Sequence, residues 1–452
     1  MRTLFEISRS GLLAAERSLS VTSNNLINAD TPGYSRQRVN KSPVGMQMGS
    51  YHSGLGVNIT SVSRLRNEMN DELMNQKRQD MGYLNGQAKV YEQLEAVMAS
   101  DSGENLDLRI SHLFDSFSAL SSDPQDMSIR QNVVSHAVQL TQTFRDIDNS
   151  LSHSSDLVLD SAGKSLDRIN LLLSDLGSIN ESIRQGEVRN NPNHMSLDLQ
   201  VQKLEELSGL IDFEEFRTPT GALEIRIGGI LVLDEDGASN LRADVNEVDK
   251  VFRLRLDNGK TVQPKGGQLG SEIEMYTKNI PELNARLDQI AETVVREVNQ
   301  LHNDGFGLED NASRDFFESD GLRAGTISVS ELIRTDIQHI AASSVAGEAG
   351  NGTLAARISE LRNVKFIGGQ NLNELSVDLI STPGSELNHL YSVMEARESE
   401  IHMLEVQQEQ EAGVNVDEEL SLLINYQNAY QGAARVMRVA QEMYDTLLSI
   451  TR

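Results

Sequence analysis

The chain has 452 residues, enough for two to four domains, and a net charge of −27. Such an acidic chain is a poor candidate for binding nucleic acid, because phosphate contacts need a basic surface. The absence of cysteine excludes disulfides, thiolate metal sites and cysteine nucleophiles. No apolar run reaches transmembrane length and no cleavable signal peptide is visible, so we expect either a cytoplasmic protein or export by another route.

The charge is unevenly distributed along the chain. Residues 1–66 contain eight basic and three acidic residues, a net charge of +5, so the remaining residues carry −32. One interpretation is an ordinary basic amphipathic helix at the N-terminus. The other is that basic segments dock on acidic surfaces of neighbouring subunits.

The first predicted helix covers residues 3–28 and carries an apolar line at seven-residue spacing. A turn follows at 30–33, where Pro32 prevents helix continuation and Gly33 permits a positive φ. Residues 34–66 are predicted to be extended, and a long helix covers about 67–98. The line that makes the first helix a candidate partner for another helix consists of Phe5, Leu12, Leu19 and Leu26.

Further helices are predicted at 104–120, 124–160, 164–189 and 196–208, with Asp123 and Pro124 opening the second and a break at 190–193. Period-two alternation then predicts strands at 223–227 and 251–256, and Asn258-Gly259 predicts a hairpin turn. Residues 212–267 therefore form a predicted small β insertion.

Helix resumes at about 270–303. A loop-rich stretch and short helices near 331–340 and 353–362 follow, then a helix over 385–411 with Pro383 and Gly384 at its start or at a kink. After a hinge at Gly413, the last helix covers 416–448. It carries two heptad lines, which predict that it seeks a partner helix. They are Leu423, Tyr430, Met437 and Tyr444, and Tyr426, Ala433, Ala440 and Leu447.

The predicted fold is mainly α with a small antiparallel β insertion, in a nested multidomain chain. We expect the terminal helices to pair as a coiled coil in one domain (1–45 and 412–452). A helical-bundle core (46–211 and 268–411) would surround the insertion (212–267). Antiparallel return of the chain would let the two termini meet.

No constellation of catalytic, cofactor-binding or metal-binding residues emerges from the sequence. No two of the nine histidines are three or four positions apart, so a helical metal pair is absent, and His136 and His302 are interpreted as ordinary packing residues. Gly163-Lys164-Ser165 lacks the earlier glycine of a phosphate-binding loop. We expect neither an enzyme nor a bound cofactor.

Two segments resemble a known family. Residues 21–37 read Val-Thr-Ser-Asn-Asn-Leu-Ile-Asn-Ala-Asp-Thr-Pro-Gly-Tyr-Ser-Arg-Gln, similar to the N-terminal signature of bacterial flagellar axial proteins. Residues 413–420 read Gly-Val-Asn-Val-Asp-Glu-Glu-Leu and are followed at 426–436 by Tyr-Gln-Asn-Ala-Tyr-Gln-Gly-Ala-Ala-Arg-Val. This end resembles the hook-associated proteins, the junction subunits between hook and filament. A second type of junction protein, a hook-like subunit and a cytoplasmic coiled-coil adaptor are the alternatives.

The resemblance implies a secreted structural subunit that is cytoplasmic before type III export and extracellular afterwards. It implies as partners further copies in a ring, the hook protein, the second junction protein, the export apparatus and a chaperone on the C-terminal helix. Nucleic acid and membrane insertion are not expected. Besides the heptad residues, the candidate interface includes Asn24, Asn25, Asn28, Pro32, Gly33 and Tyr34. For the asparagines, helix capping and bridging to a neighbouring backbone are equally compatible with the sequence.

Overall fold

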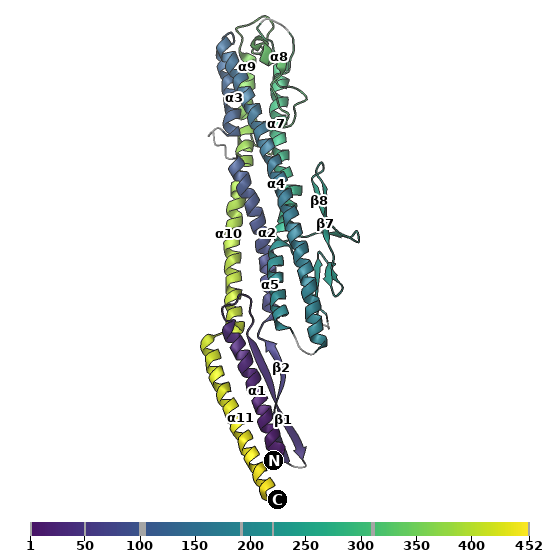
Figure 1. Ribbon diagram of the computed structural model, residues 1–452. Coiled ribbons are helices and arrows are strands. Elements are labelled where there is room, and N and C mark those ends of the chain that lie inside the picture. The colour runs from purple at the N-terminus through teal and green to yellow at the C-terminus, as the bar shows by residue number, and fades with distance from the viewer. Residues whose placement is uncertain are drawn as a thin grey trace.

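The computed structural model describes residues 2–48, 51–98, 105–189, 193–218, 221–308 and 312–450. The molecule is elongated, with the two terminal helices side by side at one end and a bundle of long helices above them (Figure 1). The prediction of a mainly helical fold with small antiparallel sheets is confirmed, as is the contact between the first and last helices.

The end that contains both termini consists of two helices and a hairpin. Helices α1 (Arg2–Ile27) and α11 (Val416–Ile450) pack along each other. Strands β1 (Gln37–Met48) and β2 (Tyr51–Arg64) form an antiparallel pair against α1. Their ladder extends on both sides of residue 45, where we expect a domain boundary, and its register shifts at Asn40/Lys41 and at Val44/Gly45.

The bundle above is formed by helices that bury apolar faces in one core. They are α2 (Glu68–Met98), α3 (Leu106–Ser122), α4 (Met127–Val188), α5 (His194–Leu210), α6 (Gly267–Glu274), α7 (Ile280–Asn303) and α10 (Leu372–Ala412). A π-helical turn, η1 (Met275–Asn279), joins α6 to α7. Phe114, Phe117, Phe144 and Leu287 are fully buried in this core.

Several predicted helix limits are wrong, beginning with those of α4. The segments expected at 124–160 and 164–189 form the single helix α4, whose N-cap is Asp126 and not Asp123. A helical glycine costs only about 1 kcal/mol, and burial of Ala162 and Leu166 on either side of Gly163 outweighs that cost. The break predicted at 190–193 lies, for residues 190–192, outside the described residues.

Helix α10 likewise begins earlier than predicted, at Leu372. A capping box fixes this start, because Asn371 and Glu374 each accept from the other's backbone amide. Pro383 lies inside the helix and is buried, so the apolar packing of Leu379 and Leu387 against the bundle overrides the expected stop.

The predicted β insertion is present as two small antiparallel sheets beside α4. The first contains β3 (Glu214–Arg217), β4 (Leu223–Ile227), β5 (Ile230–Asp234) and β6 (Gly237–Ala238); the second contains β7 (Leu241–Asn246), β8 (Val251–Leu256) and β9 (Thr261–Val262). The predicted turn at Asn258-Gly259 joins β8 to β9, and Gly259 has the positive φ (82°) that favours glycine.

The far end of the bundle is closed by irregular chain and short helices. These are α8 (Glu331–Thr335), η2 (Ile337–His339), α9 (Thr353–Glu360) and η3 (Leu361–Asn363).

His302 anchors this region: it is 1% exposed, its Nδ1 lies 2.6 Å from the Arg314 carbonyl, and its Nε2 accepts from the Ala341 amide at 2.9 Å. Burial lowers the pKa of His302 to about 4. The neutral imidazole is therefore the form that holds the two loops together.

Candidate functional site: the paired terminal helices

Small side chains let α1 and α11 approach each other closely. Ala14, Ala15 and Ala440 are buried, and a Cβ atom on Gly11 would lie 3.4 Å from the Cβ of Ala433. Ser8 is also buried and donates from Oγ to the Met437 sulfur at 3.5 Å. The helix pair is therefore held by close backbone approach as well as by larger apolar residues.

The predicted apolar lines are only partly used within one chain. On α1, Phe5, Leu12, Leu19 and Leu26 are all half-buried. On α11 the half-buried positions are Leu423, Tyr426, Ala433 and Met437. Tyr430, Tyr444 and Leu447 stay exposed, at 42%, 51% and 48%. The two predicted apolar lines of α11, called the α11 seam below, are thus left largely uncovered by the rest of the chain.

Asn25 is the polar centre of the helix pair and is 1% exposed. Its Oδ1 accepts from the Gln37 backbone amide at 3.0 Å and from the Tyr34 hydroxyl at 2.8 Å. Its Nδ2 donates to the Gln37 carbonyl at 2.9 Å and to Glu419 Oε2 at 3.1 Å. One side chain thereby ties together α1, the start of β1 and α11.

Glu419 completes this cluster from the α11 side. Its side chain is 1% exposed, and its Oε1 lies 2.8 Å from Arg36 Nε and 2.7 Å from Arg36 Nη2. Arg36 also reaches the exposed Glu418 at 3.0 Å. A buried carboxylate is costly without a partner. The register in which Glu419 meets Arg36 and Asn25 is therefore favoured over registers that would leave Glu419 buried and unpaired.

The turn after α1 is fixed on both sides. Burial, followed by the charges of Asp198 and Glu419, raises the pKa of Tyr34 to about 12, so its hydroxyl stays protonated and donates to Asn25. Gly33 has φ 78°, as its predicted role requires, and the Pro32 carbonyl accepts from Gln202 Nε2 of α5 at 2.6 Å. The turn therefore joins the terminal pair to the helical bundle.

The three predicted asparagines have different positions. Asn25 bridges, as described. Asn28 makes the local alternative, since its Nδ2 donates to the Asn24 carbonyl at 2.9 Å. Asn24 itself is exposed. Sequence reasoning missed Arg36 and Glu419, although both lie inside the quoted motifs; a charged residue adjoining an apolar seam was the available signal.

The described residues offer little for chemistry beyond assembly. Over the described ranges, no group of three or more histidine or acidic side chains is placed to hold a metal ion. None of the described helices is long and apolar enough to span a membrane. What the site has is an incompletely covered pair of helices with a buried polar cluster that sets their register.

Comparison with known proteins places these features in a family. Residues 91–317 match the helical domain of the flagellar hook-associated protein FlgK, residues 5–34 match a flagella basal body rod protein family, and residues 409–450 match the C-terminal family of the rod proteins FlgEFG.

Relatives that align over nearly their whole length are hook-associated proteins as well. The chain is 26% identical to flagellar hook-associated protein 1 of Bacillus subtilis, covering 98% of this chain and 97% of the relative. It is 23% identical to that of Escherichia coli, covering both chains completely. A flagellar hook junction protein from Burkholderia pseudomallei has a similar fold, with a TM-score of 0.65 at 12% identity over 75% of this chain and 99% of that one.

Paired terminal helices with rod-family sequence at both ends define a flagellar axial type of subunit. The chain belongs to the flagellar hook-associated protein (FlgK) family. Its role is structural and not enzymatic, and its place is the hook–filament junction of the extracellular flagellum.

Proposed function

We propose that copies of this chain form a ring at the junction through α1 and α11, with the hook protein on one side and the second junction protein on the other. The observation that carries this proposal is the exposed apolar surface of α11. Leu420, Ile424, Val439, Met443 and Leu447 are each at least 42% exposed, although α11 is already paired with α1. Exposed apolar surface of this extent marks an interaction site.

Helix α1 adds to the same surface. Leu13 and Ile27 are 52% and 77% exposed, and they lie on the face of α1 that neither α11 nor the hairpin covers. Burying such side chains between copies would stabilise the ring by about 25 cal/mol per Å² of apolar area. In this proposal the axial part comprises 1–45 and 412–452, the core 46–211 and 268–411, and the insertion 212–267.

We also propose that α11 leaves the cytoplasm bound to an export chaperone, through the type III export apparatus. A helix of 35 residues with apolar side chains on several faces is a poor candidate for an isolated helix in water. A chaperone that covers Leu423, Met437 and neighbouring residues would shield them before export. The same surface would then pair with α1 and with other copies at the junction.

The ring proposal is tested by single aspartate substitutions at exposed apolar positions of α11. Tyr430→Asp and Leu447→Asp should prevent filament attachment while the helical content of the purified chain is unchanged. Normal filaments in both strains would reject the ring contact on α11, and loss of hooks as well as filaments would point to a rod or hook subunit.

A further inference from the structure

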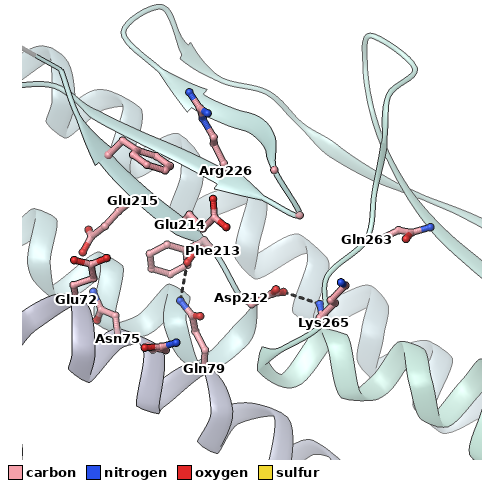
Figure 2. Close-up of a pocket in the computed structure, with 14 residues that line it drawn as sticks. Glu72, Asn75, Gln79, Asp212, Phe213, Glu214, Glu215, Arg226, Gln263 and Lys265 are labelled. Atoms are coloured by element: carbon pink, nitrogen blue, oxygen red, sulfur yellow. Dashed lines mark hydrogen bonds between the residues drawn. The ribbon is translucent and has the colours of Figure 1, made fainter.

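A cavity of about 730 Å³ lies where the β insertion joins the bundle. Figure 2 shows that it lies between α2, the segment that leads into β3, the turn after β4 and the segment after β9. Its lining carries four carboxylates, Glu72, Asp212, Glu214 and Glu215. Acidic residues alone do not define a site in so acidic a chain.

A buried amide in the same lining provides the second observation. Asn75 is 5% exposed, and within the described structure its side chain has no hydrogen-bond partner. Beside it, Gln79 is 9% exposed and donates from Nε2 to the Phe213 carbonyl at 3.1 Å, which leaves its Oε1 available as an acceptor. Both side chains line the cavity, so their free amide groups are available to a hydrogen-bonding occupant.

The lining has two cations, Arg226 and Lys265, against its four carboxylates. Arg226 packs 4.9 Å from the Phe216 ring and pairs with Glu224 outside the cavity. Lys265 donates to Asp212 through its backbone amide at 2.9 Å. Burial raises the pKa of the Glu215 carboxyl; the charge of Arg217 opposes this shift and that of Glu72 adds to it.

An occupant with many donors and a positive charge fits such a lining. A guanidinium has five N–H donors in a plane and no acceptor, and it suits carboxylate and amide oxygens together. Among the arginines of the basic N-terminal segment, Arg36, Arg64 and Arg66 have ion-pair partners within the chain. In the described structure, three others are exposed without an ion pair: Arg9, Arg17 and Arg38.

Of these three, Arg38 lies nearest to the level of the cavity along the molecule. It is opposite Ser63 in the β1–β2 ladder, one residue before β2 ends at Arg64. Helix α2 begins at Glu68, and Glu72 is one turn further along. Two copies standing side by side without a large axial shift therefore have Arg38 and the cavity at similar heights.

We propose that this acidic cavity receives Arg38 from a second copy of the chain. The contact would lie outside the paired terminal helices and would fix the rotational setting of neighbouring subunits. This inference rests on the proposed ring and names a second contact between its members.

The test uses site-specific cross-linking, for which a chain without cysteine is well suited. A strain would produce two full-length variants together, Glu214→Cys and Arg38→Cys, and isolated flagella would be treated with a short bifunctional maleimide. A cross-linked dimer is expected only when both variants are present. Arg9→Cys paired with Glu214→Cys is the matched control, because Arg9 is also exposed but lies far down α1.

A charge exchange provides a second readout. Arg38→Glu should weaken filament retention under shear several-fold, and adding Glu214→Arg should restore it. Absence of the cross-link, a yield equal to the Arg9 control, or no rescue by the exchange would overturn the inference. Filaments still attached in the single-cysteine strains would show that the ring itself survives, so the two proposals fail separately.

Discussion

The Glu419 carboxylate accepts a 3.1 Å hydrogen bond from the Asn25 amide across 394 positions of sequence. Both side chains are 1% exposed. This contact joins the N-terminal and C-terminal family motifs inside one chain. It means that the register of α11 on α1 is set by a polar contact within an otherwise small-residue interface.

Removing the charge of Glu419 tests this register. Glu419→Gln keeps the shape but leaves Arg36 without its buried partner, so we expect the α1–α11 pair to lose roughly 2–4 kcal/mol. Hydrogen exchange of α1 and α11 amides would measure the loss. Glu418→Gln is the control: it touches the same arginine but is 60% exposed, and should cost no more than about 1 kcal/mol.

Asn25 should tolerate no charged replacement. Asn25→Asp would place a second carboxylate against Glu419 and remove the donor to the Gln37 carbonyl. We expect loss of filament attachment and faster proteolysis of α11. Asn24→Asp, one position earlier and exposed, should behave like the unmodified chain. Equal behaviour of the two variants would show that the buried cluster is dispensable.

Substitutions in the uncovered part of the α11 seam should impair assembly without impairing folding. Tyr444→Asp alters a side chain that is 51% exposed, so circular dichroism and thermal unfolding should be unchanged while assembly fails. Met437→Asp, whose parent residue contacts Ser8, should disturb both the helix pair and assembly but leave the bundle folded. Collapse of the entire helical signal in either variant would contradict this separation.

His302 gives the bundle a defined pH dependence. Its pKa is lowered from 6.5 to about 4, so the stability that it contributes is present above pH 6.5 and is lost as the pH falls toward 4. The full effect is about 3 kcal/mol. Thermal unfolding between pH 6.5 and 5 should therefore drop more steeply for the unmodified chain than for His302→Gln. Parallel profiles would show that the buried imidazole has no such role.

Much of the fold could be predicted from periodicity, and the errors have a common cause. The ends of α1, the β insertion and the contact between the two terminal helices followed from local pattern. The helix limits at Gly163 and Pro383 did not, because burial against distant helices outweighed local preference. Only part of the site could be predicted. Asn25 was named from its motif, but its partner Glu419 can be recognised only once the two ends of the chain are brought together in the fold.

The most direct test of the central claim is electron microscopy of cells that lack this gene, with the medium assayed for filament protein. A structural subunit of the hook–filament junction predicts bare hooks and filament protein released into the medium. Intact filaments on those cells would contradict the account.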